Sequence, residues 1–407
     1  MHYLKIALLT LAALVLWTVL VVYGALDGWW LRSMAPAGDA TAFMDAAIER
    51  IERDGRGNLA LVLIEDGEVF DEHFAFQDQE IDRDTLFPTA SLSKWITAWV
   101  VLGLAQDGRL DLDRPVSTYL TRWSLPPSDF DNDGVTGRTL LSHTAGLADG
   151  LGFGDYLPGE TVPSVEASLA NPRASSGEEV AIAVARPPGS EWQYSGGGYL
   201  ILELLVEEIT GQSFEDHVRS AFLDPLGMSR STYDDLDGLD NVTVPYDAEG
   251  RAVTHNSYAS KAATGLASTA ADLTTLVLAQ LNDPASLPGG LDGETVRAMR
   301  EPHGRSFGAD IWGLGTILYA PTGDGDHVYG HDGQNEPAVN AAVRIHPGSR
   351  DGILVLTSGR PSMATDLGFE WVAWQTGLPD VLGFGGVIEE AIRIVLGGGV
   401  VILVLGV

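Results

Sequence analysis

The chain of 407 residues contains no cysteine and has far fewer basic residues than acidic ones. Without cysteine it can form no disulfide, no thiolate metal site and no cysteine nucleophile. Its 24 basic and 56 acidic residues give a formal net charge of -32 at pH 7. A chain this acidic repels both nucleic acid and anionic lipid headgroups. We therefore expect no nucleic-acid partner.

Lysine is especially scarce, and its three occurrences are Lys5, Lys94 and Lys261. Of these, only Lys94 has a serine, Ser91, three residues before it. The surrounding sequence at residues 87–94, Phe-Pro-Thr-Ala-Ser-Leu-Ser-Lys, indicates a turn that leads into an apolar helix. The Ser91 hydroxyl and the Lys94 amine would then share one helical face, about one turn apart.

A serine hydroxyl is a poor nucleophile unless a neighbouring group activates it. A desolvated Lys94 amine can take the proton of Ser91, and the positive end of the helix dipole favours the resulting alkoxide. The alternative interpretation of the same residues is an N-cap serine beside a solvated lysine.

The N-terminal residues 6–26 carry no charge and are mainly Leu, Val and Ala. This run is long enough to span a bilayer, which needs about 20 residues. Lys5 precedes it, and Trp29 and Trp30 follow it where interfacial aromatic residues are expected. The alternative is a cleaved signal peptide, because Tyr-Gly-Ala at 23–25 resembles a cleavage site. We favour an uncleaved membrane anchor and expect the rest of the chain on the extracytoplasmic side, periplasmic or extracellular.

The segment at residues 394–407 is also apolar, with three glycines at 397–399. It is shorter than a usual span. A second membrane segment, a tail lying on the membrane and a truncated segment are the interpretations that its sequence leaves open.

The spacing of apolar residues predicts a helix at 41–53, followed by a hairpin in which Asp-Gly separates the runs 59–64 and 69–76. Three further strands are expected near the other end, at 328–333, 339–345 and 353–357. Helices occupy most of the sequence between these strands. The sequence therefore predicts an α+β fold, in which an antiparallel sheet built from the N- and C-terminal segments is flanked by helices and carries a mainly helical inserted lobe.

Asp129, Asp131 and Asp133 have the spacing of the first half of a calcium loop. The twelfth position of that loop would be Leu140, where calcium needs a bidentate glutamate. We interpret the run as a solvated acidic turn, and expect neither a metal nor a cofactor.

Six short motifs occur along the chain in an order and spacing that resemble those of one known group of proteins. They are Ala-Ser-Leu-Ser-Lys at 90–94, Leu-Leu-Ser-His-Thr-Ala-Gly-Leu at 140–147, Tyr-Ser at 194–195, Pro-Leu-Gly-Met at 225–228, Gly-Leu through Asp-Leu at 265–273, and Gly-His-Asp-Gly at 330–333. Together they resemble the serine beta-lactamase and penicillin-binding-protein superfamily, and most closely its class C branch of beta-lactamase-related serine hydrolases. That branch includes D,D-carboxypeptidases, D-aminopeptidases and beta-lactamase-like carboxylesterases. The resemblance implies a beta-lactamase-like fold.

The resemblance implies that Ser91 is the nucleophile and that Lys94 helps to deprotonate it. Tyr194 would shuttle protons between the nucleophile and the leaving group. A nearby lysine ammonium would stabilise the tyrosine phenolate, so we expect a lowered pKa for Tyr194. We interpret His143 as a structural histidine that fixes a turn.

The resemblance also assigns residues of the 330–333 motif. His331 stands where the family often has a strand lysine, and would assist the proton relay or orient a substrate carboxylate. Gly333 would let the substrate lie against the strand edge. The backbone amides of Ser91 and Gln334 would form the oxyanion hole.

The chain departs from the family pattern at Gly196, where an asparagine that hydrogen-bonds the substrate amide is usual. Losing that asparagine and the strand lysine weakens amide recognition and the case for an efficient beta-lactamase. We therefore expect an exported serine hydrolase that acts through an acyl-enzyme on a small ester or a D-amino-acid peptide, as a carboxylesterase or a D,D- or D-aminopeptidase. The alternatives are a beta-lactamase and a sensor or binding protein that is acylated without turnover.

The expected organisation has three parts. Residues 1–40 form the membrane anchor or signal segment with its linker, and residues 41–377 form the serine hydrolase domain. Residues 378–407 form an apolar tail that is a candidate for membrane association.

Overall fold

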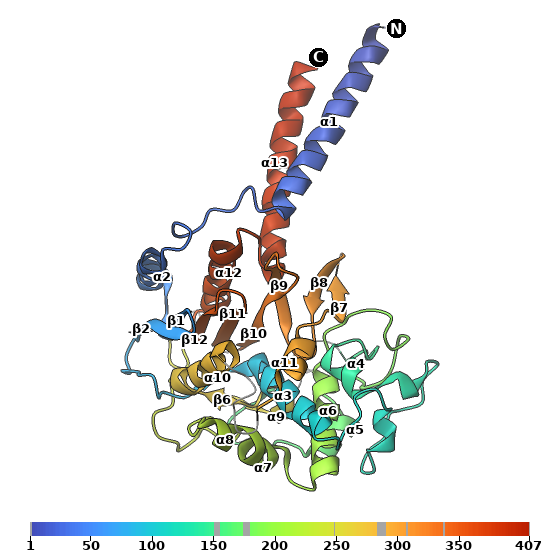
Figure 1. Ribbon diagram of the computed structural model, residues 1–407, viewed down its shortest axis with the longest axis vertical. Coiled ribbons are helices and arrows are strands. Elements are labelled where there is room, and N and C mark those ends of the chain that lie inside the picture. The colour runs from blue at the N-terminus through green and yellow to red at the C-terminus, as the bar shows by residue number, and fades with distance from the viewer. Residues whose placement is uncertain are drawn as a thin grey trace.

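The computed structural model describes residues 2–149, 155–173, 180–247, 249–282, 290–306, 308–336 and 338–406. The molecule consists of a body built on one large sheet and of two long helices that leave the body side by side (Figure 1). These helices come from the two ends of the chain, and their outer ends lie together, away from the body.

The main sheet has eight strands in the order β2-β1-β12-β11-β10-β9-β8-β7, and neighbouring strands are antiparallel. Its strands are β1 (Gly57–Glu65), β2 (Glu68–Ala75), β7 (Gly304–Ser306), β8 (Ala309–Trp312), β9 (Ile317–Pro321), β10 (His327–Asn335), β11 (Val339–His346) and β12 (Asp351–Gly359). Two short pairs lie outside it, β3 (Phe87–Pro88) with β6 (Ala267–Ser268) and β4 (Asp155–Tyr156) with β5 (Ser257–Tyr258). The N-terminal hairpin pairs with β12, which confirms the sheet expected from the two ends of the domain.

Strands β7, β8 and β9 are not expected from the sequence. They have only 3, 4 and 5 residues, which is too short to show an alternation of apolar and polar side chains. They extend the sheet beyond β10.

The helices are α1 (His2–Leu26), α2 (Ala40–Asp54), α3 (Ser93–Gln106), α4 (Gly137–Leu141), α5 (Val165–Ala170), α6 (Gly196–Thr210), α7 (Phe214–Val218), α8 (Asp224–Leu226), α9 (Lys261–Thr264), α10 (Ala270–Asn282), α11 (Gly293–Met299), α12 (Met363–Thr376) and α13 (Phe384–Leu405). Side chains of α2 and α12 pack in a smaller core on one face of the sheet. Those of α3, α6 and α10 pack in a larger core on the other face.

Side chains of β1 alternate between these two cores. Ala60 and Val62 belong to the larger core, whereas Leu61 and Leu63 belong to the smaller one. Because both faces of the strand are covered, its sequence is one continuous apolar run instead of an alternating one.

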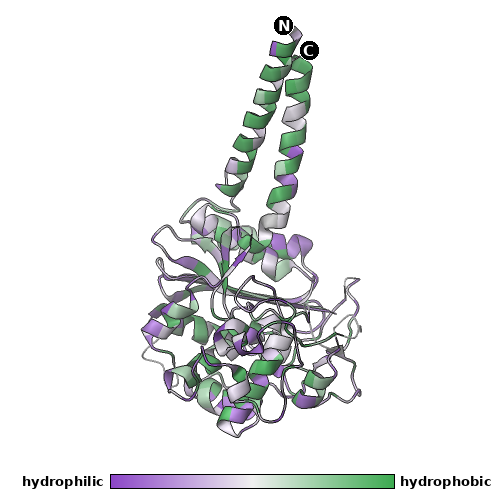
Figure 2. Ribbon diagram, turned by 90° about the vertical axis from the view of Figure 1, so that its right-hand side faces the viewer, coloured by the Kyte–Doolittle hydropathy of each residue, from purple (hydrophilic) through white to green (hydrophobic). Residues whose placement is uncertain are grey.

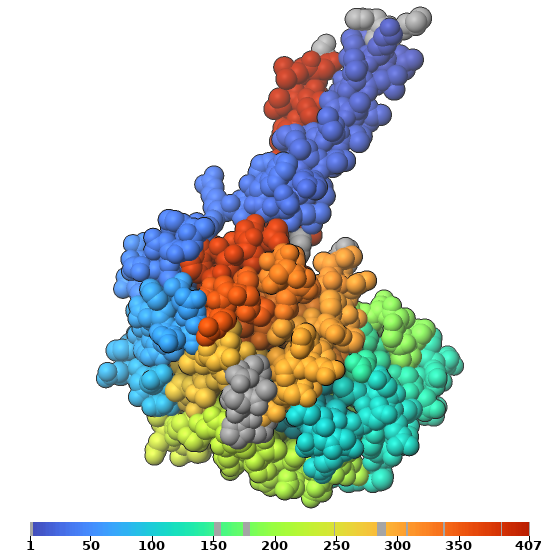
Figure 3. All heavy atoms as spheres, viewed as in Figure 1, coloured from blue at the N-terminus to red at the C-terminus, as the bar shows by residue number. Residues whose placement is uncertain are grey.

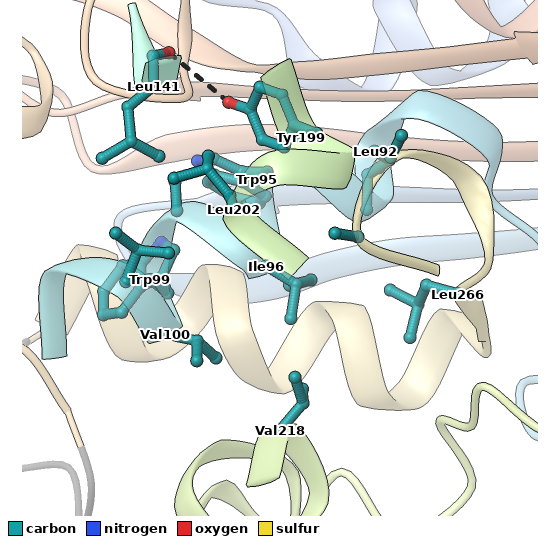
Figure 4. Close-up of a cluster of buried hydrophobic side chains, with 14 of the residues drawn as sticks. Leu92, Trp95, Ile96, Trp99, Val100, Leu141, Tyr199, Leu202, Val218 and Leu266 are labelled. Carbon is teal, nitrogen blue, oxygen red and sulfur yellow. Dashed lines mark hydrogen bonds between the residues drawn. The ribbon is translucent and has the colours of Figure 1, made fainter. Parts of the chain in front are cut away.

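Helix α3 runs through the larger core and is buried on nearly all sides. Trp95, Ile96, Trp99 and Val100 lie in the cluster shown in Figure 4. The ring of Trp99 packs against that of Phe222, with centroids 5.9 Å apart. A helix that is apolar all round belongs in a protein core or in a membrane. Packing from several directions fixes the position of α3 in the core.

Helices α1 and α13 pack along each other outside the body, and both are predominantly hydrophobic (Figures 2 and 3). The indole of Trp17 donates a hydrogen bond to the carbonyl oxygen of Ile394 at 3.3 Å. Val21, Ala25 and Ala391 form a small buried cluster between the two helices. The tail at 394–407 is thus part of a longer helix that is paired with the N-terminal one.

Within the described part of the chain, one helical segment, Tyr3–Leu26, is long and apolar enough to cross a membrane. A signal sequence near an N-terminus satisfies the same criterion. Helix α13 has 22 residues but carries Glu389, Glu390 and Arg393 in its first half.

We expect Trp99→Ala to lower the free energy of unfolding by about 3–5 kcal/mol, because truncating a fully buried tryptophan leaves a cavity in the core. The matched control is Trp123→Ala, because Trp123 is only partly buried at the edge of the same core. Its loss should cost about 1 kcal/mol. Urea unfolding followed by circular dichroism measures both, and equal losses would contradict a dominant role for the α3 core.

Candidate active site

Ser91 lies in a 3-10 turn, η1 (Ala90–Leu92), which leads directly into α3. Ala90 has a φ of 47°, in the left-handed region that residues with a side chain seldom adopt. Strained backbone of this kind persists only where the surrounding structure holds it. Here the hydroxyl of Ser93 donates to the Ala90 carbonyl oxygen at 2.6 Å and accepts from the amide of Leu266 at 3.0 Å.

The side chains of Lys94 and Tyr194 meet at the Ser91 hydroxyl. Lys94 Nζ lies 3.1 Å from Ser91 Oγ, and the Tyr194 hydroxyl donates to the same oxygen at 2.9 Å. Lys94 comes from the first turn of α3, and Tyr194 comes from the loop before α6. The fold thus brings together the three groups to which the sequence analysis assigns nucleophilic attack and proton transfer.

Burial lowers the pKa of Lys94 from its usual value to about 7. Its side chain is 1% exposed, and its Nζ donates to the carbonyl oxygen of Ala263 at 2.9 Å. The charge of Asp149 offsets part of this effect by favouring the ammonium. A large fraction of Lys94 is therefore a neutral amine near pH 7, with a lone pair that can accept the proton of Ser91.

The structure corrects the pKa expected for Tyr194. Burial raises the pKa of this phenol well above its usual value, and the hydrogen bond to Ser91 reverses only part of the increase. The expectation of a lowered pKa was wrong because desolvation of the phenolate dominates, and the carboxylate of Asp332 adds to the increase. Tyr194 is thus a neutral hydrogen-bond donor at neutral pH, and Lys94 is the group suited to accept a proton.

His331 lies on β10 and is buried beside the nucleophile in the same cavity. Its Nδ1 donates to the carbonyl oxygen of Asp332 at 2.6 Å. Burial lowers the pKa of this imidazole to about 3, so the ring is neutral. Among the described residues, its Nε2 has no hydrogen-bond partner. An unprotonated Nε2 accepts hydrogen bonds, which suits a substrate N–H or O–H better than the expected carboxylate.

Strand β10 passes against the nucleophile turn at Gly333. A Cβ at this position would lie 1.9 Å from the carbonyl oxygen of Thr89, so the close approach requires glycine. The next residue, Gln334, lines the cavity together with Ser91. The backbone of β10 therefore lies next to the Ser91 turn, as an oxyanion hole built from the amides of Ser91 and Gln334 requires.

Groups that the sequence analysis does not bring together hold Tyr194 in place. The His143 ring is buried 4.4 Å from the Tyr194 ring, and its Nδ1 accepts from the backbone N–H of Ser195 at 3.1 Å. The Asp149 carboxylate accepts from the Ser195 hydroxyl and from the N–H of Gly197, both at 2.7 Å. These bonds fix the start of α6 directly after Tyr194. The His143 side chain is structural, as expected, but it holds the loop at Ser195 instead of the turn at 139–147 in which it lies. No motif identifies Asp149.

A buried charged cluster lies next to His331. Arg344, on β11, forms two hydrogen bonds with Asp332 and an ion pair with Asp380 at 3.1 Å. Tyr319 stacks on the guanidinium, with 3.6 Å from its carbon to the ring centroid, and donates to Asp332 at 3.1 Å. Removing Arg344 would leave two buried carboxylates without their cation. The cluster therefore ties β10 to the segment that precedes α13.

Ser91 opens into a cavity of about 930 Å³. Tyr194, His331, Trp192 and Trp312 form part of its wall. This volume is within the usual range for small-molecule sites. In the described part of the chain, no three His, Asp or Glu side chains are grouped so that they could hold a metal ion.

The model of the Beta-lactamase family matches residues 43–377. The chain belongs to the Beta-lactamase family. Penicillin-binding protein 4 of Amycolatopsis lactamdurans is 30% identical over 305 residues, which cover 70% of this chain and 76% of that protein. Protein flp of Staphylococcus aureus strain COL is 27% identical over 202 residues, which cover 48% of this chain but only 39% of flp. Membership confirms the resemblance drawn from the six motifs and places the protein among beta-lactamase-fold serine hydrolases.

Solved structures of similar proteins support the same fold. SurE is 28% identical with a TM-score of 0.63, and the match covers 83% of this chain and 76% of SurE. The octameric penicillin-binding protein homologue from Pyrococcus abyssi has a TM-score of 0.66 at 24% identity, with 80% of this chain and 76% of the homologue covered. A class C beta-lactamase mutant has a TM-score of 0.63 at 18% identity, with 81% and 96% covered. The last two similarities concern the fold alone.

We expect the rate at which a fluorophosphonate labels Ser91 to rise about tenfold from about pH 6 to about pH 8. Over this range a Lys94 amine with a pKa of about 7 changes from mostly charged to mostly neutral, and only the neutral form can take the serine proton. His331 stays neutral throughout, because its pKa is about 3. Lys94→Arg is the control, since a guanidinium stays charged and should give slow labelling at every pH. A flat wild-type profile would contradict Lys94 as the base.

Proposed function

We propose that this protein is a serine hydrolase of the class C-like branch that acts through an acyl-enzyme at Ser91. Its activity would be that of a carboxylesterase or of a D,D- or D-aminopeptidase, on a small ester or a D-amino-acid peptide. One observation carries the proposal. The Ser91 hydroxyl lies 3.1 Å from Lys94 Nζ and 2.9 Å from the Tyr194 hydroxyl, in an open cavity.

Acylation begins when the neutral Lys94 amine takes the proton of Ser91 and Oγ attacks the substrate carbonyl carbon. The amides of Ser91 and Gln334 stabilise the negative oxygen that develops. Tyr194, a neutral phenol, gives its proton to the departing alcohol or amine and regains one from the Lys94 ammonium. The bond to the leaving group breaks, and an ester on Ser91 remains.

Deacylation repeats these proton transfers with water. A water molecule gives a proton to Lys94 as its oxygen attacks the carbonyl carbon of the ester. The bond between that carbon and Ser91 Oγ then breaks, Oγ regains its proton through Tyr194, and the free acid leaves. Both groups return to their starting states.

Two observations support the proposed substrates. Gly196 has no side chain at the position of the family's amide-binding asparagine, which favours esters over amides. SurE, a structural relative at 26% identity, has been solved with D-Leu, which supports a D-amino-acid ligand for this site. His331 Nε2 would accept a hydrogen bond from an N–H of such a ligand.

We also propose that α1 is an uncleaved anchor and that residues 41–377 form the catalytic domain on the extracytoplasmic side. Packing of α1 against α13 supports retention, because cleavage after residue 25 would uncover the apolar face of α13. Lys5 before the span supports a cytoplasmic N-terminus. Residues 1–40 and 378–407 would then attach the domain to the membrane.

We expect Ser91→Ala to abolish steady-state hydrolysis of p-nitrophenyl acetate by the full chain. Tyr194→Phe should lower kcat by about 10²–10⁴-fold, because it removes the proton donor to the leaving group and leaves Lys94 in place. Ser190→Ala, in an exposed turn, is the control and should keep the wild-type rate. Undiminished turnover by Ser91→Ala would exclude the proposed nucleophile.

Nitrocefin and a D-Ala-D-Ala peptide, measured in parallel, distinguish the activities. Ester turnover alone would support a carboxylesterase, whereas peptide or nitrocefin turnover would support a peptidase or a beta-lactamase. Release of one product equivalent without a steady state would favour a sensor that is acylated without turnover. Gly196 supports this alternative, because the asparagine usual at this position is missing.

A further inference from the structure

The cavity that contains Ser91 reaches the helix pair formed by α1 and α13. Its wall includes Ala25 at the end of α1, and Gly386 and Val387 in the first turn of α13. A second groove, of about 280 Å³, lies between the same two helices and is also lined by Ala25 and Val387. The groove and the cavity therefore share these two residues in their walls and lie next to each other at the base of the helix pair.

The groove between the helices is apolar. Apart from Thr18, its wall consists of alanine, valine, leucine and isoleucine side chains. Val22, Ile388 and Ile392 in this wall are 46%, 53% and 52% exposed. Exposed apolar surface of this kind, beside a segment able to span a bilayer, is suited to contact with hydrocarbon chains.

The base of the helix pair is fixed on the body next to the cavity that contains Ser91. The chain at Gly28 packs so closely that a Cβ there would lie 2.1 Å from the carbonyl oxygen of Gly377. On the other side, Asp380 precedes α13 and forms an ion pair with the buried Arg344 at 3.1 Å. Contacts on both sides therefore hold the junction between the groove and the cavity.

The cavity meets the helix pair at the level expected for lipid headgroups. Trp30 lines the cavity, and it follows the Tyr3–Leu26 span by only a few residues. Tryptophan at the end of a span is typical of the membrane interface. Glu390 also lines the cavity and pairs with Arg393 at 3.5 Å, which reduces the cost of placing these charges beside the groove.

The charged lining of the cavity constrains the head of any ligand. It contains four carboxylates and one guanidinium, from Asp332, Asp366, Asp380, Glu390 and Arg344. Outside the lining, Arg50 pairs with Asp366 and Arg393 with Glu390, so three guanidiniums face these four carboxylates. The remaining excess of one negative charge disfavours a phosphate relative to a neutral or cationic group.

We infer that the acyl donor is a long-chain ester or amide drawn from the bilayer, with a neutral or cationic head. Its hydrocarbon chain lies in the groove between α1 and α13, and its carbonyl carbon reaches Ser91 past Ala25 and Val387. The inference names the substrate class of the proposed hydrolase and so rests on that function. The carbonyl carbon bonds to Ser91 Oγ, its bond to the head breaks, and the head leaves with the proton of Tyr194, which Lys94 replaces. Water then releases the fatty acid.

Two neighbouring glycines of α13 provide the test. A Cβ added at Gly385 or at Gly386 would meet no atom within 4 Å, and of the two, Gly386 lines the cavity. Gly386→Phe therefore places a ring in the path, and Gly385→Phe makes the same chemical change outside it. The full chain is reconstituted in phosphatidylcholine vesicles. Hydrolysis of p-nitrophenyl palmitate in the same bilayer is compared with hydrolysis of p-nitrophenyl acetate in solution.

We expect Gly386→Phe to lower the ratio of palmitate to acetate turnover by about tenfold or more, and Gly385→Phe to leave it within about twofold of wild type. The same ratio in all three proteins would overturn the inference. A wild-type protein that hydrolyses the acetate but not the palmitate would also overturn it, and would leave the proposed function intact.

A binding measurement separates the inference from the proposed function. Full-length Ser91→Ala in the same vesicles is titrated with a choline ester of a pyrenyl fatty acid. Energy transfer from tryptophan to pyrene reports binding, because Trp30, Trp192 and Trp312 line the cavity. We expect binding to saturate at one probe per chain. A second substitution in the Ser91→Ala protein, Gly386→Phe, should raise the Kd of the probe about tenfold, whereas Gly385→Phe should leave it unchanged. This result together with no serine-dependent turnover would count against the proposed function alone.

Three results, two from the binding measurement and one from light scattering, would overturn the inference. Transfer that rises without saturation would mean partition into the bilayer only. A wild-type dimer that Gly386→Phe dissociates in light scattering would mean that a second copy of the chain occupies the groove. Tighter binding of a matching probe with a phosphate head would overturn the neutral or cationic head.

Discussion

Burial of a lysine amine beside a serine hydroxyl is the constraint on which the rest of the structure depends. In water a lysine side chain is charged at neutral pH and cannot accept a proton. Lys94 has a pKa of about 7 because α3 is enclosed by core on nearly all sides. The Ala263 carbonyl oxygen accepts a hydrogen bond from Lys94 Nζ, and the charge of the Asp149 carboxylate limits the decrease in the pKa. The large core around α3 thus provides the chemical state of the base as well as stability.

The same core explains why the two partners of Ser91 have different roles. Burial disfavours the charged form of either group, so it makes Lys94 a better proton acceptor and Tyr194 a poorer one. Tyr194 stays protonated and donates a hydrogen bond to Ser91 Oγ. The hydroxyl proton of Ser91 is then free to move to the Lys94 amine. Contacts with His143 and Ser195 hold the phenol in this orientation.

Features that depend on neighbouring residues could be predicted from the sequence. Ser91 and Lys94 lie one turn apart, β1 and β12 contain clear apolar runs, and Asp-Gly at 66–67 marks the hairpin between β1 and β2. Tyr194 and His331 lie far along the chain from Ser91, so they could be assigned only through the resemblance to a family. The role of Asp149, the raised pKa of Tyr194 and strands β7 to β9 could not be predicted, because they depend on burial and packing between distant segments. The sequence also showed two apolar ends without indicating that they pair.

The pairing of α1 with α13 needs an explanation beyond attachment to a membrane. The Tyr3–Leu26 segment is by itself long and apolar enough to cross a bilayer, so a tether does not require a second helix. What α13 adds is one side of an apolar groove and, through Gly386 and Val387, part of the wall around Ser91. The Arg344 ion pair with Asp380 holds the start of that helix against the catalytic strand. The proposed access of a substrate from the bilayer to Ser91 would give the second helix a role that anchoring alone does not give it.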